Sequence, residues 1–208
     1  EPIATLDSSA PLLQDLCATI QASFEEDVTR AVEEDLALVK GSSLYFAGGA
    51  ALNIPTNVRI SRLGRNLYIP PCTNDSGLAL GAAAYLEYKE RGWLPLHSPF
   101  LGRFGCECSA PPTAEIAEVG KLIESGAIVG ICNGAGEVGP RALGHRSILA
   151  RADSQILRQR LSETVKKREW YRPLAPVISG DFARDVLGSE AVESPLSRFM
   201  LGAWPVIP

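Results

Sequence analysis

At residues 134–147 the chain reads Gly-Ala-Gly-Glu-Val-Gly-Pro-Arg-Ala-Leu-Gly-His-Arg-Ser. An apolar run at 127–132 precedes this stretch and an amphipathic pattern at 153–165 follows it, which predicts a glycine-rich loop between a buried strand and a helix. Arg141 and Arg146 can offer planar, permanently charged donors to phosphate oxygens, and Ser147 adds a hydroxyl. Alternatively, Glu137 pairs with one of the two arginines. The stretch is not a P-loop, since the signature GxxxxGK[ST] is absent, and it is not a GxGxxG motif that opens a Rossmann helix.

The positive charge of the chain is concentrated after this loop. Residues 141 to 172 include nine basic and three acidic residues, so this segment has a charge of +6. Since the net charge of the chain is −4, the rest of the chain has a charge of −10. Such a block favours a local anion site. Arg168 and Arg172 flank an aromatic pair, Trp170 and Tyr171. This pair either stacks on a base or lies buried in a solvated basic turn.

Two earlier stretches could also bind a ligand. A short buried strand predicted at 43–46 runs into Gly48 and Gly49. Their backbone can approach a phosphate or ribose, or can simply make a tight turn with positive φ. A second short strand at 66–71 leads to Asp75, just before a helix predicted at 77–91. Asp75 is either a helix N-cap or a ligand of a metal or nucleotide at the mouth of a cleft.

Length and composition narrow the class of protein. The chain has 208 residues, 46% of them hydrophobic, which suits one large domain or two small ones and excludes extensive disorder. No apolar run is long enough for a transmembrane helix, and a net charge of −4 argues against nonspecific nucleic-acid binding. Five cysteines, an odd count, indicate a reducing compartment and hence the cytoplasm.

The pattern of helices and breakers predicts two parts of an α/β protein. A long helix is expected at 12–39, and helices at 113–125 and 181–187 follow a proline- and glycine-rich stretch that shows no period. We therefore expect a first part at 1–93, a linker at 94–112 and a second part at 113–208. The chain starts with Glu1 and ends on an apolar run at 199–207 that resembles an interrupted strand, so we expect a piece of a longer protein.

Taken in order, these stretches resemble the O-carbamoyltransferase family of nodulation proteins and antibiotic-biosynthesis enzymes. The residues that carry the resemblance are Ala47-Gly-Gly-Ala-Ala-Leu-Asn53, Asn57-Val-Arg-Ile60, Ile69-Pro-Pro71, Asp75-Ser-Gly77, Leu80-Gly-Ala-Ala83, Gly139-Pro-Arg-Ala-Leu-Gly-His-Arg-Ser-Ile-Leu149 and Arg168-Glu-Trp-Tyr-Arg-Pro-Leu-Ala-Pro176. The resemblance covers nearly the whole chain, and its run from 139 to 149 is long and specific.

The resemblance implies a fold and a reaction. Residues 1–93 would be the C-terminal part of an actin-like, sugar-kinase-type domain, and 113–208 would be a truncated YrdC-like α/β domain. The second domain would form carbamoyl-adenylate from carbamoyl phosphate and ATP, and the first would pass the carbamoyl group to a hydroxyl of a sugar or natural-product acceptor. The partners would be these small molecules, without nucleic acid or membrane, and a homo-oligomer is compatible with the family.

The resemblance also implies roles for individual residues. The catalytic set that would hold carbamoyl phosphate and the ATP phosphates is Arg141, Arg146, Arg168 and Arg172. The residues implied to bind the cofactor ATP are Gly48, Gly49, Asn53, Asn57 and Ser147. Asp75 would be a ligand of a divalent metal ion, and a single carboxylate does not select among Fe, Mn and Mg.

The chain also departs from the family pattern. The paired-histidine motif HxxxH of the family's metal site is absent, His145 stands where Asn is common, and Val138 stands where an aromatic residue is usual. A rival hypothesis is therefore a noncatalytic, truncated homologue that binds nucleotide or phosphate. Pyrophosphate exchange into ATP that depends on carbamoyl phosphate would separate the enzyme from this binding module.

Overall fold

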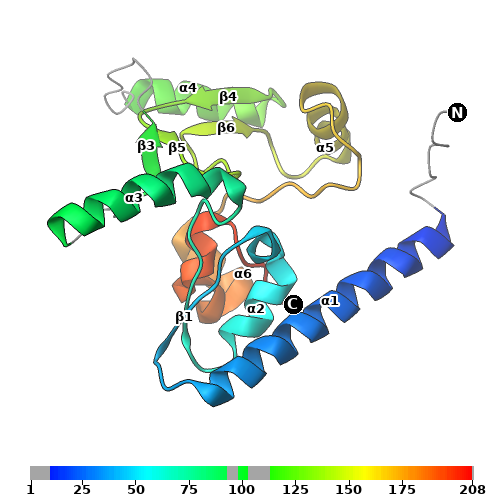
Figure 1. Cartoon of the computed structure of the whole chain (residues 1–208). Helices are drawn as coiled ribbons and strands as arrows, with labels where there is room; N and C mark the ends of the chain where they lie inside the picture. Colours follow the sequence, from blue (N-terminus) through cyan, green and yellow to red (C-terminus); the bar gives the residue numbers. More distant parts are fainter. Residues whose placement is uncertain (1–9, 93–97, 103–112, 208) are drawn as a thin grey trace, which may run out of the picture.

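The computed structural model describes residues 10–92, 98–102 and 113–207, which form a mixed α/β structure with small sheets (Figure 1). The longer helices and the strands, in chain order, are α1 (Pro11–Leu38), β1 (Ser43–Tyr45), α2 (Ile54–Ser61), β2 (Asn66–Tyr68), α3 (Leu78–Arg91), β3 (Phe100–Gly102), α4 (Thr113–Glu124), β4 (Val129–Cys132), β5 (Gly136–Glu137), β6 (Arg146–Leu149), α5 (Gln155–Gln159) and α6 (Gly180–Glu193). The short helical turns are η1 (Gly49–Leu52), η2 (Asp75–Gly77), η3 (Arg160–Val165) and η4 (Pro195–Phe199).

The first sheet of the chain is a parallel pair, β1 beside β2, in which Leu44 lies opposite Leu67. Parallel strands bring their carboxyl ends to one edge, so the segments that follow β1 and β2 meet there. The prediction of a buried strand at 43–46 is wrong in its burial. Tyr45 is exposed and packs at a tilt against Tyr68, with 5.6 Å between ring centroids.

The helices that the apolar spacing predicts are present. Helix α1 matches the predicted 12–39 to within one residue at each end and packs on α2. Helix α4 corresponds to the prediction at 113–125. The C-cap of helix α3 is Gly92, which has a φ of 73°. Helix α3 corresponds to the prediction at 77–91, and none of its side chains is buried within the described residues. No helix within the described ranges has the length and apolar character needed to cross a membrane.

The predicted linker contains a strand. Strand β3 pairs antiparallel with β5, so the prediction that 92–112 lacks strand structure is wrong at Phe100–Gly102. The two strands approach closely at Gly102, where a Cβ would lie 3.1 Å from the backbone oxygen of Gly136, so a larger residue would need a small shift of the neighbouring strand. The rest of the linker from 94 to 97 and from 103 to 112 lies outside the described residues, and the division of the chain into parts at 1–93 and 113–208 stays a prediction.

The hydrophobic core joins the segment from 51 to 69 with residues between 196 and 201. Its buried members are Ala51, Val58, Ile60, Leu67, Ile69, Leu196 and Leu201. Five of these come from the segment around β1, α2 and β2. The other two are Leu196 of η4 and Leu201, which follows η4 closely. Helices α2 and α6 lie in the lower half of Figure 1. The packing of residues 196 and 201 therefore contributes to the stability of the segment around α2.

The C-terminal part differs from expectation in detail. Helix α6 is longer than the predicted 181–187 and is interrupted at Gly188, which has a φ of 81°. The terminal apolar run is not a strand, since its residues after η4 form irregular structure, and Ile207 donates its backbone N–H to the carbonyl of Val186 at 2.8 Å. The helix expected at 153–165 is α5 followed by the π-helical turn η3, and the N-cap of α5 is Ser154.

Leu196→Ala tests the shared core. Leu196 is 2% exposed, so its truncation should lower the free energy of unfolding by about 2–5 kcal/mol through lost burial and a residual cavity. The matched control, Leu38→Ala, changes a side chain that is 83% exposed and should shift the value by no more than about 0.5 kcal/mol. Urea unfolding followed by circular dichroism measures both, and equal effects would show that Leu196 is not a core residue.

Candidate anion-binding site

The Gly-Gly turn and the turn before Asp75 lie side by side. The backbone N–H of Gly48 donates to the carbonyl of Thr73 at 2.7 Å, and the Thr73 hydroxyl donates to the carbonyl of Gly48 at 3.5 Å. Gly48 has a φ of 97°, a conformation that favours glycine, and a Cβ at Gly48 or Gly49 would meet no atom within 4 Å. The parallel pairing of β1 and β2 thus brings together two of the predicted ligand-binding stretches, and open space lies above the glycines.

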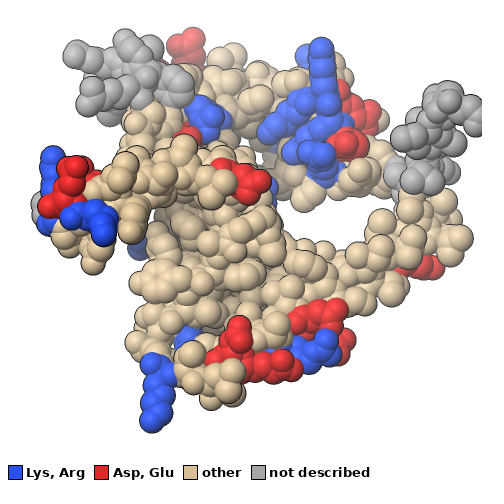
Figure 2. Space-filling view, viewed as in Figure 1, with Lys and Arg blue, Asp and Glu red and all other residues tan. Residues whose placement is uncertain are grey.

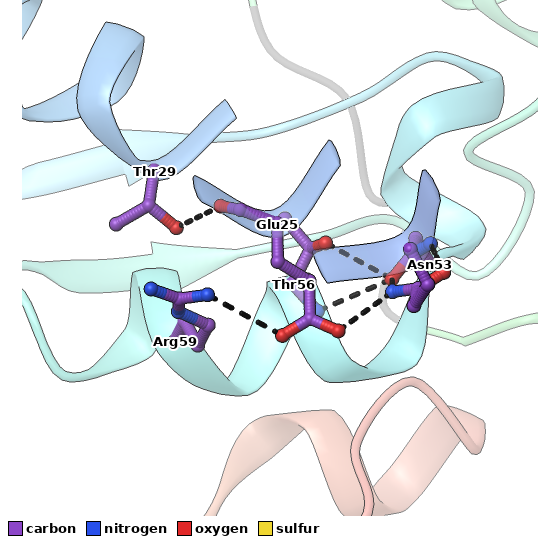
Figure 3. Close-up of polar contacts among 6 residues, drawn as sticks. Glu25, Thr29, Asn53, Thr56 and Arg59 are labelled. Atoms are coloured by element: carbon purple, nitrogen blue, oxygen red, sulfur yellow. Dashed lines mark hydrogen bonds and ion pairs between the residues drawn. The ribbon is translucent and has the colours of Figure 1, made fainter. Parts of the chain in front are cut away.

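Asn53, predicted to bind the cofactor, makes structural contacts. Its Oδ1 accepts from the backbone N–H of Thr56 at 3.2 Å and from the Thr56 hydroxyl at 2.9 Å, so it is the N-cap of α2 (Figure 3). Its amide also forms a reciprocal pair with the side chain of Gln21, at 3.0 and 2.9 Å. Nearby, Arg59 of α2 lies 3.5 Å from Glu25 of α1. These contacts attach α1 to α2.

Asn57, also predicted to bind the cofactor, is fully buried. Its Nδ2 donates to the carbonyls of Ala51 and Leu201, both at 2.9 Å, and so connects η1 to the C-terminal segment. Its Oδ1 is buried without a hydrogen-bond partner among the described residues. The structure therefore places Asn57 in the shared core, below the glycine turn rather than at its surface.

Asp75 is exposed and begins η2, with Asn74 at the cap position. Asn74 accepts a hydrogen bond at 2.7 Å from the hydroxyl of Ser76. Within the described ranges, no group of three or more His, Cys, Asp or Glu side chains could hold a metal ion. A divalent metal generally needs several such ligands, so the described residues do not fit a complete metal site around Asp75.

The loop after β5 contacts the same edge as these two turns. Gly139 has a φ of 111°, and a Cβ at this position would lie 2.3 Å from the backbone oxygen of Pro71 and 3.2 Å from the Cα of Cys72. Any other residue at 139 would collide with this backbone. Three sequence stretches, those at 48–49, 71–75 and 139–147, therefore converge in the fold.

Glu137 organises this loop. Its side chain is fully buried, and its Oε1 accepts from the backbone N–H groups of Leu143, His145 and Arg146 at 2.8, 2.8 and 3.1 Å. Its Oε2 accepts from Arg146 Nε at 2.7 Å, and Arg146 Nη2 donates to the Glu137 carbonyl at 2.9 Å. This is the alternative in which Glu137 pairs with an arginine.

These contacts determine the charge state of Glu137. Burial by itself raises the pKa of the carboxyl, but the hydrogen bonds from Arg146 and from the loop amides outweigh it and lower the pKa from 4.5 to about 2. Glu137 is therefore an anion throughout the physiological range. The sequence signal for this arrangement was the single acidic residue in a loop rich in glycine and arginine.

The four predicted arginines fall into two pairs. Arg146 is bound to Glu137, and Arg172 pairs with Glu169 at 2.7 Å, with both partners about half exposed. In contrast, the Nε atoms of Arg141 and Arg168 are buried and have no hydrogen-bond partner in the described part of the chain. Arg168 also donates from Nη2 to the carbonyl of Pro173 at 3.1 Å. An unpartnered guanidinium N–H is costly when buried, and this distinguishes Arg141 and Arg168 from the two arginines that have carboxylate partners.

The remaining residues of the loop region also have defined partners. The Ser147 hydroxyl accepts from the backbone N–H of Gly144 at 3.1 Å. His145 lies 2.7 Å from the carbonyl of Ala135 through Nδ1, and its ring stacks on Phe100 with 4.0 Å between centroids. This stack, which sequence reasoning missed, joins the loop to β3. It follows from the pairing of β3 with β5, for which the sequence shows no periodic signal.

The basic block lies on the surface of the second part of the chain. Trp170 and Tyr171 are exposed and meet edge to face, 5.9 Å apart, rather than being buried. Figure 2 shows Lys and Arg side chains gathered over the upper region where α5 lies, and Asp and Glu along α1. The charge separation along the sequence is therefore also a separation in space.

The lowered pKa of Glu137 predicts how stability depends on pH. The folded pKa of about 2 lies below the unfolded value near 4.5, so the contribution of Glu137 is complete above pH 4.5 and is lost as the pH falls toward 2. The Glu137→Gln variant lacks this titration. The difference in free energy of unfolding between wild type and variant, measured in urea at several pH values, should be constant above pH 4.5 and shrink below it. A difference that does not change with pH would contradict the lowered pKa.

Two family models match most of the chain. The model described as carbamoyltransferase N-terminus matches residues 3–84, and the one described as carbamoyltransferase C-terminus matches residues 120–208. The three converging stretches are divided between them, since those at 48–49 and 71–75 lie in the N-terminal match and that at 139–147 lies in the C-terminal match.

Similar proteins have names of the same kind. Nodulation protein U of Azorhizobium caulinodans is 34% identical over 89% of this chain and 35% of its own length, and nodulation protein U of Sinorhizobium fredii is 39% identical over 69% and 27%. The 3'-hydroxymethylcephem-O-carbamoyltransferase of Streptomyces clavuligerus is 37% identical over 67% of this chain and 29% of its own length. The chain thus spans about a third of the length of these curated relatives. On the two model matches and these relatives, the chain belongs to the carbamoyltransferase family and corresponds to part of such a protein.

Proposed function

We propose that the whole protein is an O-carbamoyltransferase and that this chain contributes the site for its anionic substrates. The observation that carries the proposal is the pair of buried guanidinium Nε atoms, those of Arg141 and Arg168, that have no hydrogen-bond partner among the described residues. Both residues lie in the C-terminal family match, and one of the relatives is named an O-carbamoyltransferase. Donors of this kind, held by the fold before the ligand arrives, suit phosphate oxygens.

The substrates that we propose are carbamoyl phosphate and ATP, both of which are polyanions. Carbamoyl phosphate would first react with one water molecule to give carbamate and phosphate. A carbamate oxygen would then bond to the α-phosphorus of ATP as the bond from that phosphorus to pyrophosphate breaks, which gives carbamoyl-adenylate. The oxygen of an acceptor hydroxyl would then bond to the carbamoyl carbon as its bond to the adenylate oxygen breaks, releasing AMP and a proton. The acceptor that we propose is a small molecule with a hydroxyl group, such as a sugar or natural product, and the hydroxymethylcephem in the name of one relative is a molecule of this kind.

The four arginines would have different roles in this reaction. Arg141 and Arg168 would donate to phosphate oxygens and offset the negative charge that develops during transfer. Arg146 and Arg172 already have carboxylate partners, so their positive charge is largely compensated within the protein. The open turn at Gly48 and Gly49 is the position that we propose for the nucleotide in the first part of the chain.

We also propose a fold for each part of the chain and a cellular location for the enzyme. The first part would belong to an actin-like domain and the second to a YrdC-like domain of a cytoplasmic enzyme. The described residues do not supply a complete metal site around Asp75, so no step of the proposal is assigned to a metal ion.

Removal of Arg141 tests the anion site. Calorimetric titration of the chain with carbamoyl phosphate, and separately with ATP, should show binding that weakens roughly 10- to 150-fold in Arg141→Ala, because hydrogen bonds to charged groups contribute about 1.5–3 kcal/mol. The matched control is Arg158→Ala, which removes an exposed arginine of the same basic block whose side chain contacts only Gln155 at 3.4 Å among the described hydrogen bonds. Equal weakening by the two variants would indicate attraction by general charge and would reject the assigned site.

Activity separates the enzyme from a noncatalytic binding module. In the whole protein, an enzyme of the proposed kind exchanges labelled pyrophosphate into ATP only when carbamoyl phosphate is present. A module that only binds phosphate or nucleotide shows the titration but no exchange.

A further inference from the structure

The loop that carries Arg141 is closed on itself by one buried carboxylate. Glu137 lies at its start and accepts hydrogen bonds from three backbone N–H groups near its end, those of Leu143, His145 and Arg146. All three reach the same oxygen, Oε1, at 2.8–3.1 Å. The backbone between 137 and 143 therefore cannot change its span without breaking charge-assisted hydrogen bonds in a site without solvent.

A second contact fixes the loop before it reaches Arg141. Gly139 lies so close to the backbone of Pro71 and Cys72 that no side chain fits between them. Arg141 thus lies between two fixed positions, two residues after Gly139 and two residues before Leu143. The Nε atom of Arg141 is buried and has no partner in the described structure, whereas Arg146 donates to Glu137 with two of its side-chain nitrogens.

We infer that Glu137 is a positioning residue for the proposed anion site, which holds Arg141 in place by closing the loop, and that Arg146 acts as the partner of Glu137 rather than as a ligand of the substrate. The inference rests on the proposed function for the identity of the anion. A buried ion pair stabilises a fold little compared with apolar packing, but it can specify one conformation. Here the specified conformation is that of the segment from 139 to 143.

The experiment uses the chain itself and inorganic pyrophosphate as a nonreactive probe. Glu137→Gln keeps one oxygen for the loop amides but presents an amide N–H₂ group to Arg146, which cannot accept its hydrogen bond. We expect pyrophosphate to bind at least tenfold more weakly to Glu137→Gln by calorimetry. We also expect faster amide hydrogen exchange at 143, 145 and 146. The control Asp153→Asn removes an exposed carboxylate that lies 2.6 Å from Arg151 Nε, and it should change neither quantity.

A double-mutant cycle separates positioning from general destabilisation. In an Arg141→Ala background, Glu137→Gln should weaken pyrophosphate binding no further, because the donor that it positions is gone. An equal further loss, or unchanged affinity in the single variant despite faster exchange, would overturn the inference and leave the proposed function intact. Wild-type chain that binds neither pyrophosphate nor carbamoyl phosphate would overturn the proposed site, and the inference with it.

A second variant keeps the test valid if Glu137→Gln fails to fold. Arg146→Lys preserves the charge beside Glu137 but loses the planar pair of donors to its carboxylate and carbonyl. Weaker pyrophosphate binding in this variant supports the positioning role. In the whole protein, this role also predicts that the fold-decrease in kcat is smaller than the fold-increase in KM for carbamoyl phosphate. Unchanged affinity would overturn it.

Discussion

The buried carboxylate of Glu137 is the constraint on which the arrangement of the candidate site depends. A charge without solvent must be compensated by hydrogen bonds and an opposite charge, and here both come from one short segment, 143–146. Because the compensating groups are mostly backbone N–H groups, they fix the path of the chain and not only the position of a side chain. The glycines at 139 and 144, both with positive φ, allow the backbone to make the turns that this requires.

The second constraint is topological. Parallel pairing of β1 and β2 places the turns after both strands at one edge, and Gly139 contacts that edge through the backbone of Pro71. The shared core reinforces this arrangement, since Leu196 and Leu201 pack with residues from α2 and β2. Two kinds of contact therefore join segments that are far apart in the sequence. One is apolar packing in the core, and the other is the close backbone contact at Gly139.

Periodic features of the sequence were predicted well, and single polar residues were not. Helices α1, α3 and α4 follow from apolar spacing and breaker residues, which act locally. Strand β3 and the irregular end of the chain depend on distant partners, Glu137 and Val186, that no local pattern specifies. Asn53 illustrates the difficulty at the site, because an amide just after a glycine turn suits a ligand and a helix cap equally.

The arginines show why residue type alone could not assign roles. All four lie in the basic block, and in the sequence each is equally suited to bind phosphate. In the fold their surroundings differ, since Arg146 faces a buried carboxylate and Arg172 an exposed one. The Nε atoms of Arg141 and Arg168 are buried and find no partner in the part of the chain that the structure describes. A guanidinium that already has a carboxylate gains less from an added anion than one whose desolvation is uncompensated. Assigning a substrate ligand among like-charged residues therefore depends on which desolvated donor lacks a partner, and only the folded structure contains that information.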